Sequence, residues 1–150
     1  MSSPDLKTSS DLDVHRRDIH GATLLHHACK CGQEVDTAQR LLDQGAWVNA
    51  RDRDSKAPLH YACQNKNVKT VELLLRQRAF LDAKDKDELT PLHYSCRLGH
   101  DEVVLLLLDK GVWVSTRDRD SKTPLHYSCQ NNHAKTVELL LDRRAFLDAK

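Results

Sequence analysis

One short segment returns four times along this chain at a nearly constant interval. Thr-Pro-Leu-His-Tyr-Ser-Cys stands at 90–96 and again at 123–129, and close variants stand at 23–29 and 57–63. The starts of successive segments are 34, 33 and 33 residues apart, and a leucine-rich block follows each one. A unit of this length cannot bury its own apolar face, so neighbouring units must stack to form a shared core. The sequence therefore predicts a solenoid rather than a globular domain with one central core.

A longer period lies over the first. Residues 51–84 and 117–150 are identical at 27 of 34 positions, at a shift of 66 residues. The array is thus predicted to consist of a two-repeat unit, odd then even, that has been copied once.

Each unit carries the start and stop signals of two helices. In the third unit Thr90 and Pro91 suit an N-cap and a first helical position, which predicts a helix near 90–98. Gly99 ends that helix, and a wide apolar face predicts a second one over 101–110. The polar stretch 117–122 then predicts a turn that projects before the next helix pair. The first aspartate of each such turn is expected to cap it; these are Asp52, Asp85 and Asp118.

These motifs resemble those of the ankyrin repeat family. The resemblance rests on the Thr-Pro-Leu-His core, the Gly-His pair at 99–100 and the period of 33, and it covers residues 18–150. It implies an all-α solenoid of antiparallel helix pairs with protruding β-hairpin fingers, divided into repeats 18–51, 52–84, 85–117 and 118–150, after a mobile tail at 1–17. It also implies binding to another protein through the finger tips and the concave side of the first helices.

Several repeats lack the glycines that the family pattern places at left-handed positions. The finger glycine is replaced by Ser55, Glu88 and Ser121, and the glycine after the second helix by Arg78 and Arg144. A side chain in a left-handed conformation costs about 1 kcal/mol. We therefore expect the even-numbered repeats, which lack both glycines, to be the weaker ones.

Charge and hydropathy restrict the function classes. The chain has 23 Lys and Arg against 22 Asp and Glu, a net charge of +1, so no positive surplus indicates nucleic-acid binding. Its longest aliphatic run, 103–108, is far shorter than the roughly 20 residues of a membrane-spanning helix, which predicts no membrane insertion. The odd number of cysteines, five, and the lack of an apolar signal segment favour a cytoplasmic or nuclear protein.

The recurring histidines and cysteines are interpreted as structural. One histidine per repeat is expected to link neighbouring loops, and one cysteine per repeat to pack as a small buried side chain; these are His26, His60, His93, His126, Cys29, Cys63, Cys96 and Cys129. Cys31 falls out of register and should be exposed. The cluster at 26–31 cannot bring four ligands to one zinc ion on a helix, so no metal, cofactor, catalytic residue or small-molecule substrate is predicted.

The predicted partner-binding surface comprises finger and first-helix positions. The alternating charges of the fingers are interpreted first as a solvated, self-neutralising ladder, and alternatively as a partner contact. If the fingers contact the partner, Leu89 is the preferred residue as an apolar side chain among charges, beside the lysines at 56 and 122. The first helices are expected to contribute mostly polar side chains to the groove. The full set is Leu89, Arg97, Leu98, Gln64, Asn65, Gln130, Asn131, Lys56, Lys122, Tyr61, Tyr94 and Tyr127. The tyrosines either pack in the core with a wet hydroxyl or contact the ligand directly.

Four aromatic residues share a position just after the second helix: Trp47, Phe80, Trp113 and Phe146. Either they pack over the loop and offset the missing glycines, with arginines stacked on the phenylalanines, or they form an exposed stripe for a second partner.

Together these observations predict a monomeric, non-catalytic protein-binding module, a scaffold or adaptor. The alternative is the ankyrin segment of a longer enzyme, channel or membrane-associated adaptor. The chain stops at the end of a repeat without a polar capping unit, which favours a fragment over an open end that is itself a docking surface.

Overall fold

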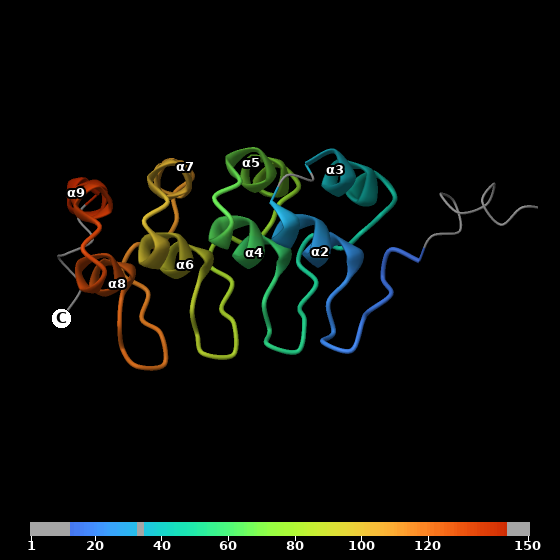
Figure 1. Cartoon of the computed structure of the whole chain (residues 1–150), viewed down its shortest axis with the longest axis horizontal. Coiled ribbons are helices and arrows are strands. Elements are labelled where there is room, and N and C mark those ends of the chain that lie inside the picture. Colours follow the sequence, from blue (N-terminus) through green and yellow to red (C-terminus); the bar gives the residue numbers. More distant parts are fainter. Residues whose placement is uncertain (1–12, 33–34, 144–150) are drawn as a thin grey trace, which may run out of the picture.

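A computed structural model describes residues 13–32 and 35–143 of the chain. Within these ranges eight α-helices follow one another in four antiparallel pairs, and no strand occurs (Figure 1). The pairs are α2 (Leu24–Cys31) with α3 (Val35–Asp43), α4 (Pro58–Gln64) with α5 (Val68–Arg76), α6 (Pro91–Leu98) with α7 (Asp101–Asp109), and α8 (Pro124–Gln130) with α9 (Ala134–Asp142). The predicted all-α solenoid is confirmed.

The helices form two layers, and the loops between repeats project away from them. In Figure 1 the first helices α2, α4, α6 and α8 lie side by side in one row, and the second helices lie in a row above them. The loops that lead into each first helix hang below the lower row. Each of these fingers is a tight turn closed by backbone hydrogen bonds. In the second finger the N–H of Asp52 donates to the carbonyl of Lys56 at 3.0 Å, and the N–H of Ser55 donates to the carbonyl of Asp52 at 2.9 Å. The predicted fingers are therefore present as short turns rather than as strands.

The core runs the length of the array because equivalent positions stack on one another. Leu25, Leu59 and Leu92 occupy one position in the first helices and are fully buried, as are Leu74 and Leu107 in the second helices. Each repeat leaves one flank of its leucines bare until the next repeat covers it, so burial here is a property of the junctions. This apolar contact is the main source of stability, since single helices of 7 to 9 residues would not persist alone.

The residues that stand in place of the family's glycines adopt the left-handed backbone conformation. The predicted left-handed residues Ser55, Arg78, Glu88 and Ser121 all have positive φ, between 62° and 70°. Lys66 and Asn132, which follow the first helices of the even repeats, are also left-handed, a feature that the sequence comparison missed. Arg144 lies outside the described residues.

The described part of the predicted tail is folded. Val14 is buried in the core, and Arg17 Nη1 donates to the carbonyl oxygens of Gly21 at 2.8 Å and Arg51 at 2.5 Å. The ordered array therefore begins before residue 18, because Val14 covers apolar surface that the first repeat leaves open. The rest of the predicted tail, residues 1–12, lies outside the described residues.

Candidate protein-binding groove

A groove of about 580 Å³ lies between the fingers and the first helices of the N-terminal half. Its walls come from the first two fingers, α2, α4 and the end of α6. Among the residues that line it are Lys56, Tyr61, Gln64, Asn65 and Leu98, all predicted from the sequence, together with Lys30. The structure thus brings five predicted partner-binding residues to one surface.

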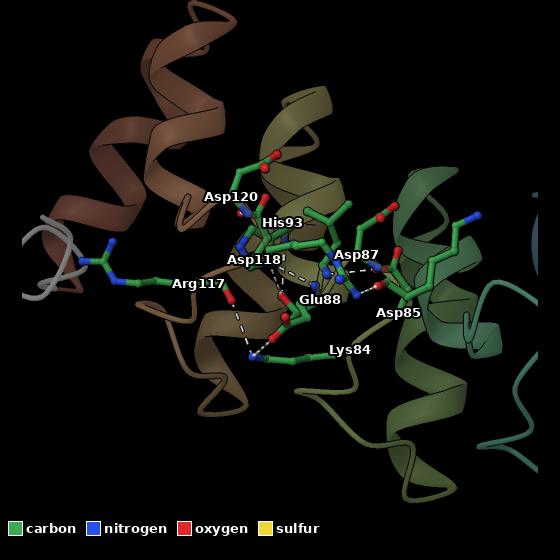
Figure 2. A network of polar contacts seen from close by, with 12 residues as sticks. Lys84, Asp85, Asp87, Glu88, His93, Arg117, Asp118 and Asp120 are labelled. Carbon is green, nitrogen blue, oxygen red and sulfur yellow. Dashed lines mark hydrogen bonds and ion pairs between the residues drawn. The ribbon is translucent and has the colours of Figure 1, made fainter.

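Each finger is held by an aspartate at its base, as predicted. Asp85 Oδ1 accepts hydrogen bonds from the N–H groups of Asp87 and Leu89, both at 2.9 Å. Its Oδ2 accepts a hydrogen bond from the hydroxyl of Tyr94. Asp52 makes the same contacts with Tyr61, and Asp118 with Tyr127. Figure 2 shows the third and fourth fingers, where Asp85 and Asp118 lie within this network.

Burial and the hydrogen bonds to the aspartates determine the protonation state of the tyrosine hydroxyls. Burial, and then the hydrogen bond to the aspartate, raises the pKa of Tyr61, Tyr94 and Tyr127 well above the ordinary value, so the hydroxyls stay protonated donors. Burial opposes the charge of Asp118, but the bonds from Tyr127 and two backbone N–H groups lower its pKa overall. Each tyrosine hydroxyl is thus bonded to its finger aspartate, a contact that the sequence pattern does not indicate.

The recurring histidines join consecutive repeats, as predicted. His60 Nδ1 accepts from the N–H of Ala57 at 3.0 Å, so Nε2 carries the proton and donates to the carbonyl of Leu89 in the next repeat at 3.0 Å. His26 and His93 reach the carbonyls of Lys56 and Lys122 in the same way, at 2.9 and 3.0 Å. Burial lowers the pKa of all three imidazoles, that of His60 to about 4, so they are neutral at pH 7.

Neighbouring fingers are also tied to one another. The N–H groups of Arg53, Lys86 and Arg119 donate to the carbonyls of His20, Asp54 and Asp87 in the preceding finger, all at 2.9 Å. Lys86 Nζ of the third finger lies 2.9 Å from Asp54 Oδ1 of the second. Within the third finger, Lys84 Nζ lies 3.4 Å from Glu88 Oε1 (Figure 2). Part of the alternating charge is thus a ladder among the fingers themselves. The groove wall is consequently a fixed surface.

Basic side chains lie over the tyrosine rings along the floor of the groove. Lys56 Nζ lies 5.3 Å from the Tyr61 ring centroid and 5.0 Å from that of Tyr94. Lys30 lies over Tyr61, Arg97 over Tyr94 and Lys122 over Tyr127, at 5.9, 5.0 and 5.7 Å. Cation–π contacts of this kind hold the ammonium and guanidinium groups in place without neutralising them.

Leu89 is not an exposed contact. The residue is 8% exposed at the base of the finger, where its N–H donates to Asp85 and its carbonyl accepts from His60. The prediction of Leu89 as the preferred apolar contact is therefore wrong. By contrast Leu98 is exposed, and so are Gln130 and Asn131, while Arg97 is half-buried against Tyr94.

The cysteines divide by position along the array. Cys29, Cys63 and Cys96 are buried and Cys31 is exposed, as predicted. Cys129 is exposed, contrary to the prediction, because none of the described residues packs on the far side of α8. No group of three metal-ligating side chains gathers within residues 13–32 and 35–143. None of the described helices is long and apolar enough to cross a membrane.

The aromatic residues after the second helices are exposed. Trp47, Phe80 and Trp113 are 59%, 61% and 71% exposed, and Phe146 lies outside the described residues. The expected packing over the loop is therefore wrong for these three, and Arg78 does not stack on Phe80. The loop is held instead by an asparagine side chain of the preceding repeat, because the N–H of Phe80 donates to Asn49 Oδ1 at 2.8 Å. The Trp47 ring is partly covered by His15, at a centroid distance of 4.2 Å.

Comparison with known proteins agrees with this architecture. The family model for ankyrin repeats (3 copies) matches residues 6–85 and 78–150. A segment of 34 residues, 23% of this chain, is 62% identical to the ankyrin repeat and LEM domain-containing protein 1 homolog of Caenorhabditis elegans. A segment of 57 residues, 38% of the chain, is 44% identical to the human BCL-6 corepressor-like protein 1. These matches span 5% and 3% of the two relatives.

The family match covers most of the chain, and the helix pairs, the histidine links and the aspartate-based fingers recur with the period of the sequence. The chain belongs to the ankyrin repeat family.

Proposed function

We propose that this chain is a non-catalytic protein-binding module, a scaffold or adaptor, that takes up a segment of a partner protein in the groove between its fingers and first helices. The observation that carries the proposal is the groove itself. Its tyrosines and aspartates are bonded to one another, whereas Lys30, Asn65 and Leu98 are exposed on its surface. Ankyrin repeats generally bind other proteins, which supports the same assignment.

The mechanism is presentation of a preformed surface. Backbone bonds between fingers and histidine bonds between repeats fix the groove before a partner arrives, so little ordering free energy is lost on binding. The exposed amides and charges supply hydrogen bonds at the rim, and Leu98 supplies a small apolar contact.

Site-directed photo-crosslinking in cells tests the surface. A benzoylphenylalanine is placed singly at Gln64 in the groove, at Trp113 on the aromatic flank, or at Glu72 on the outer face of α5. We expect discrete protein adducts from position 64 and none from position 72. Adducts from position 113 alone would move the binding surface to the aromatic flank, and no adducts from any position would contradict a protein-binding role.

A double substitution in the groove should remove the crosslinks that position 64 forms. The Arg97→Glu, Leu98→Ala variant changes one half-buried cation and one exposed leucine, neither of which belongs to the core, so helix content by circular dichroism should be unchanged. We expect this variant to lose the adducts of position 64. Leu89 is left intact, because truncating a buried side chain would destabilise the finger rather than report on binding.

A further inference from the structure

The fourth repeat exposes the face that the second repeat buries. The sequences that include these two repeats are identical at 27 of 34 positions, at a shift of 66 residues. Leu59 and Cys63 of the second repeat are fully buried, whereas the equivalent Leu125 is half-buried and the equivalent Cys129 is exposed. We call the side of α8 and α9 that faces away from α6 and α7 the trailing face; it lies at the left end of the array in Figure 1. The trailing face is thus an apolar surface whose covered counterpart is visible within the same molecule.

The third repeat covers this face of the second repeat by apolar packing and by hydrogen bonds. Its first helix, α6, packs along α4, and His60 Nε2 donates to the carbonyl of Leu89 at 3.0 Å. The carbonyl of Asp54 accepts from the N–H of Lys86 at 2.9 Å. The face therefore takes an occupant that offers one carbonyl at the base of a finger and one N–H in the turn of that finger.

The equivalent groups of the fourth repeat have no partner within residues 13–32 and 35–143. His126 Nδ1 accepts from the N–H of Thr123 at 2.9 Å, so Nε2 carries the proton, and no described carbonyl accepts it. The carbonyl of Asp120 likewise accepts from no described N–H. A donor and an acceptor that are bonded at every earlier junction therefore remain available on the trailing face.

The first repeat carries the complementary groups at the opposite end of the array. We call the side of α2 and α3 that faces away from α4 and α5 the leading face. Ala22 stands there at the sequence position of Leu89, and Ile19 at that of Lys86. The carbonyl of Ala22 accepts one described hydrogen bond, from the N–H of Asp18 at 3.0 Å, whereas that of Leu89 accepts two. The N–H of Ile19 has no acceptor among the described residues, so the first finger offers both groups that the trailing face takes.

The leading face is also apolar. Leu24 stands where the other three repeats carry proline, and it is exposed, whereas the equivalent Pro91, which begins α6 beside α4, is buried. Ile19 is exposed as well. Val14 is buried against this end of the core but leaves both side chains open. Apolar surface therefore stands uncovered, among the described residues, at both ends of the array.

The two ends also match in repeat type. The repeat that covers the second one is an odd repeat, whose first helix has Arg97 in its last turn and is followed by a left-handed Gly99. The first repeat is of the same type, since α2 has Lys30 in its last turn and is followed by a left-handed Gly32. A junction from the fourth repeat to the first would therefore join an even repeat to an odd one, like the junction from the second to the third.

We propose that copies of this chain bind one another head to tail, with the trailing face of one copy against the leading face of the next. His126 Nε2 donates to the carbonyl of the next copy's Ala22, and the carbonyl of Asp120 accepts from the N–H of the next copy's Ile19. Ile19 stands in place of a lysine, so the ion pair that accompanies the second bond at the earlier junction is not reproduced. The contact joins two different faces, so each added copy leaves one face of each kind available and growth continues beyond a dimer. The proposal goes beyond the proposed function, because the end faces do not include Gln64.

Sedimentation equilibrium over a range of protein concentrations tests the association. A reductant is present throughout, because the exposed Cys31 and Cys129 would otherwise be free to form disulfides between copies. We expect the weight-average mass to rise with concentration from the 17.1 kDa of one chain to about twice that value and beyond, without a plateau at the dimer. The monomer that the sequence predicts would instead keep the same mass at every concentration.

Three single substitutions with equal charge change locate the contact. Leu24→Glu alters the leading face and Cys129→Glu the trailing face, and both side chains are exposed in the single chain. Leu105→Glu is the control, since Leu105 is exposed on α7 in the third repeat, and the second and fourth repeats carry Glu72 and Glu138 at the same position. We expect both end variants to stay monomeric where the parent chain associates, and the control to associate within twofold of the parent. Circular dichroism should give the parent melting temperature for all three.

Mixing the two end variants tests the direction of the contact. The Leu24→Glu chain keeps an intact trailing face, and the Cys129→Glu chain keeps an intact leading face. An equimolar mixture therefore allows one contact between two unlike chains and no further growth. We expect a one-to-one complex whose mass stays at that of two chains as the concentration rises.

Any of three results would overturn the proposal. These are a constant monomer mass for the parent chain, association of either end variant alone to the extent of the parent, or an equal loss of association in the Leu105→Glu control. Leu141→Glu is a second trailing-face variant in case Cys129→Glu loses helix content, because Leu141 is exposed and the equivalent Leu75 is half-buried. If the parent chain stays monomeric while position 64 still forms crosslinks to other proteins, head-to-tail association is wrong and the proposed function stands.

Discussion

At the scale of single residues, the start of each first helix depends on a threonine and a histidine three positions later. Thr23, Thr90 and Thr123 stand at this N-cap, and their N–H groups donate to the histidine of the same repeat. The threonine oxygen of the third repeat also accepts from the N–H of His93, at 3.4 Å. The second repeat carries Ala57 instead, so the oxygen is missing there while the histidine contact is kept.

Restoring that oxygen should stabilise the second repeat. We expect Ala57→Thr to raise the free energy of unfolding by about 1 kcal/mol, the usual value of a threonine N-cap. Thr90 and Thr123 are fully buried at the equivalent position, which indicates that the larger side chain fits there. Urea unfolding followed by circular dichroism measures the change, with Thr90→Ala as the reverse experiment. A loss of stability in Ala57→Thr would contradict this account of the cap.

The linking histidines give the array a pH dependence. Burial lowers the pKa of His60 from 6.5 to about 4, so on acidification the unfolded chain takes up this proton before the folded one does. The free energy of unfolding is therefore full above pH 6.5 and falls as the pH drops toward 4, by about 2 kcal/mol from His60 alone at pH 5. Urea midpoints between pH 7.5 and 5 measure the slope. His60→Gln should flatten it, and the exposed-site control His20→Gln should not.

At the scale of helices and turns, the glycines at the helix ends differ in how closely a neighbouring side chain approaches them. Gly99 and Gly111 both have positive φ, 72° and 88°, and both end a helix. A Cβ at Gly111 would meet nothing within 4 Å, whereas one at Gly99 would lie 2.5 Å from Nδ1 of His133. That imidazole donates through Nε2 to the carbonyl of Arg97 at 2.8 Å, so it cannot move without losing a bond between repeats.

The two glycines should accordingly differ on substitution. We expect Gly111→Ala to lower the free energy of unfolding by about 1 kcal/mol, the cost of a left-handed alanine. Gly99→Ala should cost about 2 to 3 kcal/mol, because the displaced ring also loses its hydrogen bond. Thermal and urea unfolding of both variants tests the difference. Equal losses would show that His133 swings aside freely.

The helices and turns could be predicted from the sequence more fully than the exposure of single side chains. Helix pairs, fingers and their aspartate caps follow from the spacing of Thr-Pro, Gly and Asp, because these residues act on the backbone within a few positions. Whether Leu89 or Trp113 is buried depends on side chains of the adjacent repeat and on where the chain turns, which no local pattern contains. The stacking of basic side chains on the tyrosine rings is also absent from any local pattern, since Lys30 and Lys56 share no repeat position and meet only over the Tyr61 ring.

At the scale of the whole molecule, burial of a repeat position changes along the array. The cysteines at 29, 63 and 96 lie between first helices, whereas Cys129 on α8 has a neighbour on one side only among the described residues. Identical sequence environments thus give different accessibility. The exposure of a repeat position therefore depends on whether another repeat packs against it.

Thiol reactivity should reveal this pattern. We expect two of the five thiols, Cys31 and Cys129, to react rapidly with Ellman's reagent in the native protein at pH 8. The other three should react only on opening, because burial raises the pKa of Cys29 and Cys96 to about 12 and that of Cys63 further still. All five should react in denaturant, and mass spectrometry of labelled peptides assigns the rapid pair. Three or more rapid native thiols would contradict the described packing.

The histidine links also have a direction. In the links made by His26, His60 and His93 the donor belongs to the earlier repeat, and the acceptor carbonyl lies 29 or 30 residues further along the chain. His100 and His133 instead donate back to Gln64 and Arg97 of the preceding repeat. During synthesis from the N-terminus, a newly emerged imidazole has no acceptor until roughly one more repeat has left the ribosome. The first-helix histidine of each of these repeats is therefore fully bonded only once the following repeat is in place.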